Sequence, residues 1–83
     1  MIIHNIINLK VLDNYELLAT FDDGKNKKYD MKPLIEEIKA LQPLKTVKGL
    51  FQKAHLSPKG YGVIWNDDID MDSYIIYKEG IDV

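Results

Sequence analysis

An acidic run at residues 67–72 has the spacing closest to that of a ligand-binding motif. Counted from Asp68, aspartates stand at the first, third and fifth positions and Glu79 at the twelfth, the order of oxygen ligands in a calcium-binding loop. Ser73, however, occupies the sixth position, where the sharp bend of such a loop needs glycine. We therefore expect the run to be structural, with a turn at its start and Asp72 capping a helix.

The two histidines, His4 and His55, could serve as metal ligands or as general bases. They are far apart in a chain without cysteine, so a zinc site would need both rings and carboxylates to meet in space. No serine, cysteine or carboxylate stands at a recognisable catalytic spacing from His55. We predict no catalytic residue, no metal ligand and no cofactor, and hence a protein that is not an enzyme.

A cluster of lysines is the best candidate for contact with an anion. Its members are Lys25, Lys27, Lys28 and Lys32. All 11 basic residues of the chain are lysines, whereas arginine is the usual residue for bidentate contacts to bases and phosphates. Such a cluster is typical of a solvated face that protects an edge strand. We do not expect the chain to bind nucleic acid by itself, although weak contact with phosphates alone stays open.

The composition indicates a small folded protein. The 83 residues suffice for a single domain, residues 1–83, with 46% hydrophobic and 29% charged residues. The absence of cysteine favours a reducing compartment. The first residues contain no basic leader, and no stretch approaches the roughly 20 apolar residues that span a bilayer. We expect a cytoplasmic protein without membrane contact.

The first third of the chain has the pattern of a three-stranded antiparallel meander. Apolar and polar residues alternate in residues 7–11 and 15–21, with a two-residue turn at Asp13 and Asn14 between them. A second turn at residues 22–25, with Gly24 able to take a positive φ, leads to a strand at residues 26–30. The residues expected on the inner face are Ile7, Leu9, Val11, Tyr15, Leu17, Ala19, Phe21 and Tyr29.

The rest of the chain predicts helices, a hairpin and a last helical turn. Apolar residues at helical spacing are Leu34, Ile35, Ile38 and Leu41 in a first helix ended by Pro43, and Leu44, Val47, Leu50 and Phe51 in a second. Strands at residues 53–56 and 61–65 and an extended piece at 69–71 precede a helical turn closed by Gly80. The predicted class is α+β, with a three-stranded meander, one or two helices, a second β-hairpin and a short C-terminal helical turn.

Several residues are candidates for a partner surface. Leu12 and Leu18 lie on the meander face opposite the main core, where helices that cover only one face would leave them exposed. The other candidates are Trp65, Asp70, Tyr77, Lys27 and Lys28. A homodimer formed by pairing of edge strands is a further expectation. A domain that binds a small molecule or a metal is the alternative to a protein-binding role.

The order of several short elements carries a family resemblance across residues 6–80. These elements are Val11-Leu12, Tyr15-Glu16-Leu17, Phe21-Asp22-Asp23-Gly24, Tyr29-Asp30, Pro33-Leu34, Leu44, Phe51, Trp65, Asp70-Met71 and Tyr77. Together they resemble a small bacterial family of domains of unknown function, family 2442 in that series. The resemblance implies an α+β fold without established catalytic residues. It also implies a protein-interaction module, the antitoxin of a toxin–antitoxin-like pair whose partner is the neighbouring-gene product.

Overall fold

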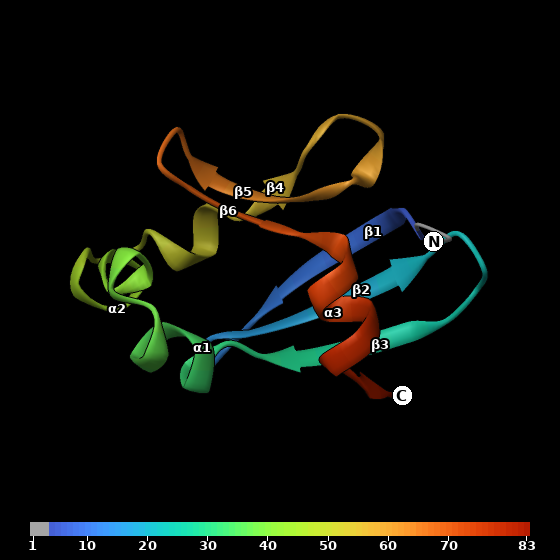
Figure 1. Ribbon diagram of the computed structural model, residues 1–83, viewed down its shortest axis with the longest axis horizontal. Helices are drawn as coiled ribbons and strands as arrows, with labels where there is room; N and C mark the ends of the chain where they lie inside the picture. Colours follow the sequence, from blue (N-terminus) through green and yellow to red (C-terminus); the bar gives the residue numbers. More distant parts are fainter. Residues whose placement is uncertain (1–3) are drawn as a thin grey trace.

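The described residues, 4–83 in this computed structural model, form two antiparallel sheets and several short helices (Figure 1). The four-stranded sheet, in the order β1-β2-β3-β7, consists of β1 (Ile6–Leu12), β2 (Glu16–Phe21), β3 (Asn26–Asp30) and β7 (Ile81–Asp82). The three-stranded sheet consists of β4 (His55–Leu56), β5 (Gly62–Asn66) and β6 (Ile69–Asp72). The helices are α1 (Lys32–Glu37), α2 (Pro43–Thr46) and α3 (Ser73–Glu79). The predicted α+β class and its meander are confirmed.

A β-bulge near the start of β1 changes which residues of this strand face the core. Ile6 lies opposite Phe21 and Asn8 lies opposite Thr20, so Ile7 is the extra residue between them. Because the bulge shifts the alternation by one residue, Ile6 is buried and Ile7 is 64% exposed. The prediction that Ile7 faces inward was therefore wrong, whereas Leu9 packs against the core as expected.

The loop between β1 and β2 is one residue longer than predicted. Leu12 pairs with Glu16, which leaves Asp13, Asn14 and Tyr15 in the loop, and both Asn14 and Tyr15 have φ of 60°. Tyr15 therefore does not belong to the strand, although its ring still packs edge-on against Phe51 at a centroid distance of 5.2 Å. The next turn follows the prediction, with Gly24 at φ of 89°.

The middle segment is a series of short helical pieces instead of two continuous helices. After α1 the backbone becomes extended at Ile38, and after α2 it becomes extended at Val47. Between and after these breaks lie 3-10 turns at Lys39–Leu41 and Phe51–Lys53. The first break frees the carbonyl of Ile35, which accepts a hydrogen bond of 2.8 Å from the side-chain amide of Gln42. Gln42 thus satisfies a helix end that periodicity alone did not predict.

The last third contains the predicted hairpin and helix, together with one strand that was not predicted. β4 and β5 are joined through a 3-10 turn at Pro58–Gly60, and β5 and β6 through Asp67 and Asp68. α3 runs for two turns and ends at Gly80. β7 follows at once and pairs with Lys27 and Lys28 of β3. A strand of two residues has no periodicity, so its sequence did not reveal it.

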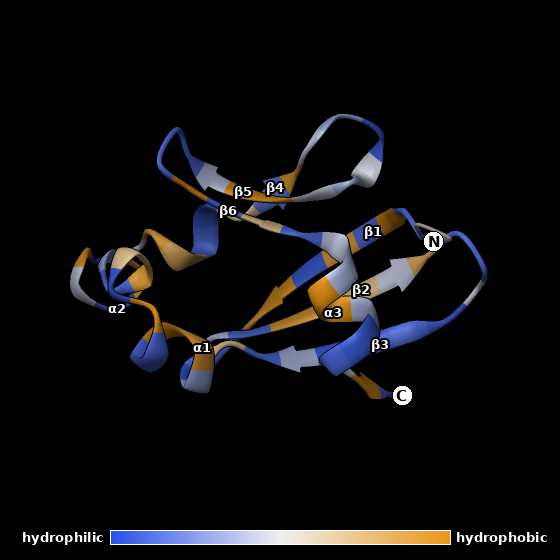
Figure 2. Ribbon diagram, viewed as in Figure 1, coloured by the Kyte–Doolittle hydropathy of each residue, from blue (hydrophilic) through white to orange (hydrophobic). Residues whose placement is uncertain are grey.

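The core lies between the two sheets and α3. Figure 1 shows the three-stranded sheet above the four-stranded one and α3 across the face of the latter, and Figure 2 shows hydrophobic residues on the facing segments. Leu17, Ala19 and Phe21 of β2 are fully buried. Val63 of β5 and Ile76 of α3 are also fully buried. These contacts fix α3 against the sheet and so position the surfaces beside it.

Candidate functional site

The acidic run does not assemble into a cation site. The side chain of Asn66 shapes the turn, because its Oδ1 accepts hydrogen bonds of 2.9 Å from the amides of both Asp68 and Ile69. Asp70 is exposed on β6, and Asp72 stands at the N-cap position of α3 without a side-chain capping bond. Within residues 4–83, the group of side chains close enough to share a metal ion contains none of these aspartates. The run thus belongs to a turn, a strand and a helix start.

Two residues predicted for a partner surface are in fact buried. Trp65 is 3% exposed, and its indole Nε1 donates a hydrogen bond of 3.1 Å to the carbonyl of Phe51. Lys27 is 8% exposed, and its ammonium group lies 2.6 Å from a carboxylate oxygen of Asp82. Lys27 is buried because strand β7, which the sequence did not predict, pairs with β3 at this residue. Neither side chain is available to a partner.

The remaining predicted residues lie on different parts of the surface. Leu12 and Leu18 are half-buried, and Leu18 has Lys10 and Lys28 as its cross-strand neighbours. Asp70 is exposed on the three-stranded sheet. The half-buried Tyr77, on α3, donates a hydrogen bond of 2.6 Å to Asp23. These side chains therefore do not form one continuous patch.

A groove lies where β3, α1 and α3 meet, and it encloses about 570 Å³. Its apolar lining consists of Tyr29, Pro33, Leu34, Tyr74, Ile75 and Ile81. Tyr74 is 44% exposed and Ile81 is 70% exposed. Of the residues predicted for a partner surface, Lys28 lines this groove. In the groove, the exposed side chains of Tyr74 and Ile81 lie next to the half-buried Tyr29, Leu34 and Ile75.

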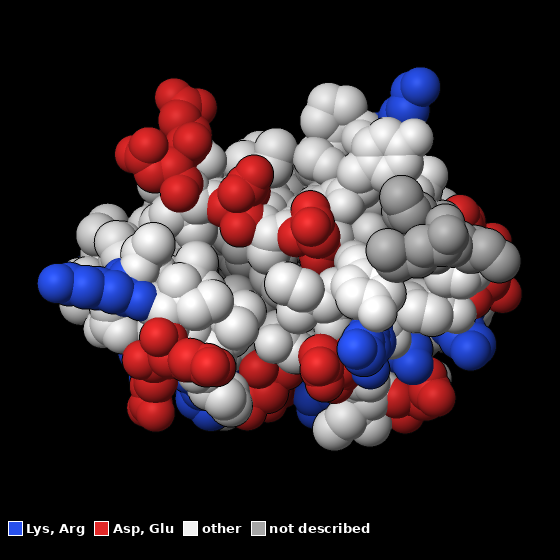
Figure 3. All heavy atoms as spheres, viewed as in Figure 1, with Lys and Arg blue, Asp and Glu red and all other residues white. Residues whose placement is uncertain are grey.

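Charged side chains of both signs surround the apolar part of the groove. Lys28 and Lys78 contribute positive charge, and Asp30, Glu37 and Glu79 contribute negative charge. Figure 3 shows acidic and lysine side chains interspersed along the lower edge of the molecule, where β3 and α1 lie in Figure 1. Burial, reinforced by Glu79 and Asp30, raises the pKa of the Tyr29 phenol above its ordinary value. The phenol is therefore a hydrogen-bond donor at neutral pH.

The groove could not be found from sequence because its walls come from three separate segments. Tyr29, Leu34 and Ile75 follow strand or helical periodicity, which predicts burial in the core. All three are half-buried in the structure, where they pack against the edge of the core and line the groove. The exposed wall does have a sequence signal. Tyr74 lies off the helical face that contains the buried Ile76, and Ile81 lies beyond the end of α3.

A second constellation joins His4 to the turn between β2 and β3. The Nδ1 atom of His4 lies 3.4 Å from Asp22 and 3.7 Å from Asp23. The hydrogen bond from Tyr77, and then that from the backbone amide of Lys25, lowers the pKa of the Asp23 carboxyl. His55 is exposed and interacts with the carbonyl of Lys53, so the two histidines do not meet. The strand register could have revealed this cluster, because antiparallel pairing of Ile6 with Phe21 brings His4 beside the turn.

Comparison with known proteins gives a family but no characterised relative. A family model described as a protein of unknown function, DUF2442, matches residues 6–82. No curated protein and no solved structure matches the chain. In the described part of the chain, no helix has the length and apolar character needed to cross a membrane.

Proposed function

The chain belongs to the DUF2442 family of proteins of unknown function, and we propose that it is a protein-binding module whose groove receives a segment of a partner polypeptide. The observation that carries this proposal is the apolar groove between β3, α1 and α3 with its charged rim. Protein interfaces commonly combine an apolar, tyrosine-containing centre with a polar rim. Tyr29 and Tyr74 provide two such aromatic side chains.

The shape of the groove favours a polypeptide over a small ligand. Its volume would suit a small molecule, but small-molecule sites usually enclose about 70–90% of the ligand surface with a few convergent polar groups. Here the walls are side chains at the surface, including Ile81 and Tyr74, which remain well exposed. The charged lining residues carry both signs, so they do not offer a site of one charge to a small ionic ligand. Such a rim can select a partner by complementary charge along an extended segment.

The strand β3 supports binding of an extended or helical segment. β7 pairs only with Lys27 and Lys28, so β3 continues to Asp30 beyond its neighbour on this side of the sheet. Tyr29 and Asp30 lie in this continuation and line the groove. On this side the chain itself continues from β7 through Gly80 into α3, so a partner segment would lie in the groove, over Leu34 and Ile75, and would not pair with the edge of β3.

We propose further that the partner is the product of the neighbouring gene and that this chain acts as the antitoxin of such a pair, without catalysis, in the cytoplasm. The antitoxin role is supported by the family resemblance, and the cytoplasmic setting by the absence of cysteine. A metal-binding role is the second candidate, and the cluster around His4 favours it.

Co-expression tests the proposed function directly. The chain and the neighbouring-gene product are expected to elute together from a size-exclusion column. Ile81→Asp, which places a charge in the groove, is expected to weaken the complex at least about 10-fold, because an unpaired carboxylate would be buried where the partner now meets an apolar side chain. Ile7→Asp is the matched control, since Ile7 is 64% exposed and Ile81 70%, but Ile7 lies outside the groove.

Two results would contradict the proposal. If the wild-type pair eluted separately, the neighbouring-gene product would not be the partner. If both variants weakened the complex equally, the groove would not be its binding surface. A wild-type chain that eluted as a dimer with itself, and lost this state in Ile81→Asp, would identify a second copy as the occupant of the groove.

A further inference from the structure

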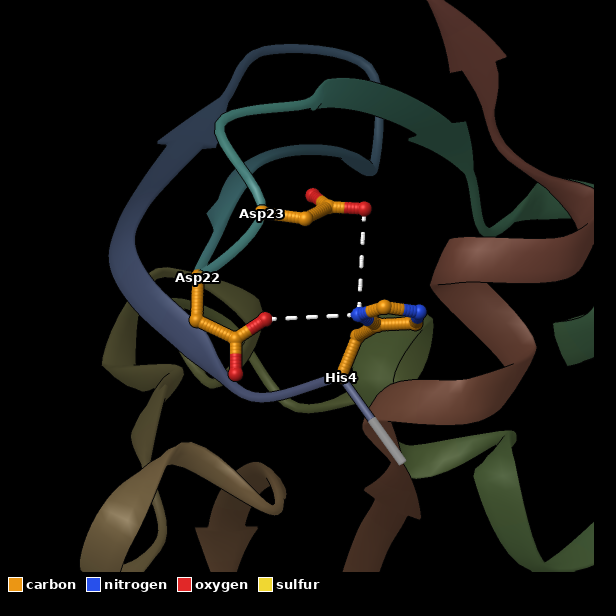
Figure 4. Close-up of side chains that lie close together, drawn as sticks. All are labelled: His4, Asp22 and Asp23. Atoms are coloured by element: carbon orange, nitrogen blue, oxygen red, sulfur yellow. Dashed lines mark hydrogen bonds and ion pairs between the residues drawn. The ribbon is translucent and has the colours of Figure 1, made fainter. Parts of the chain in front are cut away.

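Three potential metal ligands converge on one point beside the turn between β2 and β3. His4 precedes β1, and Asp22 and Asp23 form the turn (Figure 4). The Nδ1 atom of His4 faces both carboxylates, at 3.4 Å from Oδ1 of Asp22 and 3.7 Å from Oδ2 of Asp23. One ligand atom from each residue can be chosen so that all three lie within 4.8 Å of one another.

These distances suit a shared cation better than direct hydrogen bonds. A hydrogen bond from a ring nitrogen to a carboxylate normally spans about 2.7–2.9 Å, and Nδ1 carries at most one proton for two carboxylates. Ligand atoms that surround an ion tetrahedrally at about 2.1 Å lie about 3.4 Å apart. The separations of 3.4 and 3.7 Å are close to that value. The three ligand atoms lie within 4.8 Å of one another, so the two carboxylates would close in around an ion that binds between them and His4.

The backbone on both sides of the cluster is held in place. The amide of Asp22 donates a hydrogen bond of 2.9 Å to the carbonyl of Asn5, which fixes the turn against the start of β1. The carbonyl of His4 accepts a hydrogen bond of 3.0 Å from the hydroxyl of Ser73, a residue of α3 that is 2% exposed. The main chain that carries His4 is thus fixed to two separate elements.

Tyr77 of α3 holds two of the three side chains. Its ring stacks on the His4 imidazole with a centroid distance of 4.2 Å and an interplanar angle of 16°. Its hydroxyl donates a hydrogen bond of 2.6 Å to Oδ2 of Asp23. Residues that orient metal ligands in this way are common around protein metal sites. The arrangement of His4 and Asp23 is therefore set before any ion binds.

We propose that His4, Asp22 and Asp23 bind a divalent transition-metal ion of the zinc class. An imidazole nitrogen and two carboxylate oxygens form a ligand set that such ions accept, and the two carboxylates balance the charge of the ion. The side chains of the three residues are 25%, 43% and 25% exposed, respectively. One side of the ion therefore faces solvent, where a water molecule or a group from another molecule completes the coordination.

Calorimetric titration of the untagged full chain with Zn²⁺ tests this site. The wild-type protein is expected to bind one ion per chain, and Asp22→Asn and His4→Ala are each expected to weaken binding by about 100-fold or more, since loss of a merely supporting group costs about 10–100-fold. His55→Ala is the matched control and is expected to leave the affinity unchanged, because His55 is exposed and remote from the cluster.

Tyr77→Phe separates support by the hydroxyl from stacking by the ring. This variant keeps an aromatic ring beside His4 but loses the hydrogen bond to Asp23, so the affinity is expected to fall by about 10-fold. Circular dichroism spectra of all variants confirm that they are folded. Absence of saturable binding at millimolar Zn²⁺ would overturn the proposal. Equal affinities of the wild type and the folded His4→Ala variant, or a loss in His55→Ala as large as in His4→Ala, would also overturn it.

Discussion

Replacement of Gly60 by alanine is expected to lower the free energy of unfolding by about 3 kcal/mol or more, because it combines backbone strain with a steric clash. Gly60 is buried at the end of the turn Pro58–Gly60 and has a φ of +72°. An added methyl group would collide with the backbone carbonyl of Ile6 at the start of β1. Because that oxygen cannot rotate away, the turn and β1 must separate. Urea denaturation measures the loss.

Gly24→Ala is the matched control for the effect at Gly60. Gly24 also has a positive φ, of +89°, but within residues 4–83 no atom apart from its own chain neighbours lies within 4 Å of the position that its Cβ would occupy. In this variant the free energy of unfolding is expected to fall by only about 1 kcal/mol, which is the cost of the backbone conformation alone. Equal losses in the two variants would contradict the close contact between the turn and β1.

Replacement of Phe51 by alanine is expected to lower the free energy of unfolding by about 3–5 kcal/mol, the usual cost of removing a fully buried aromatic ring. Phe51 is 1% exposed and lies between Tyr15, at a centroid distance of 5.2 Å, and Trp65, at 5.9 Å. It therefore joins the helical segment to both sheets. A protein of this length has a total stability of about 4–12 kcal/mol, so much of it would be lost. Chemical denaturation monitored by tryptophan fluorescence measures the change.

Tyr61→Ala is the control for the loss of an aromatic ring that is not part of the core. Tyr61 is 51% exposed, so its removal is expected to change the free energy of unfolding by no more than about 0.5 kcal/mol. If Phe51→Ala lowered the free energy of unfolding as little as this control does, the segment Phe51–Lys53 would not be packed between the sheets.

Most strands could be predicted from sequence because their alternation and turns are local. The strand at residues 26–30 has the predicted bounds, and Leu17, Ala19 and Phe21 form the expected inner face. Ile7 was assigned to the wrong face because a bulge depends on the pairing of two strands, which alternation within one strand cannot show. The breaks in the helices were missed for a similar reason. The chain leaves the helix at Ile38. The freed carbonyl of Ile35 then accepts a hydrogen bond from the side chain of Gln42, seven residues further along the sequence.

The two candidate sites were harder to predict because both depend on the position of α3. Tyr77 brings His4 and Asp23 together only after α3 has packed on the four-stranded sheet. Tyr74 and Ile75 line the groove together with Tyr29 of β3 and Leu34 of α1, which are distant in the sequence. Trp65 was assigned to the surface because tryptophan is common at interfaces, but its indole nitrogen finds a partner in the buried carbonyl of Phe51. Sequence patterns predict burial well along one element and poorly where several elements meet.

The central claim is that a partner polypeptide occupies the groove between β3, α1 and α3. Amide chemical shifts of the isotope-labelled chain, measured with and without the co-purified partner, test it most directly. The largest changes are expected at Tyr29, Leu34 and Ile75 and at their neighbours in the groove. Changes centred instead on the three-stranded sheet, at His55 and Asp70, would contradict it.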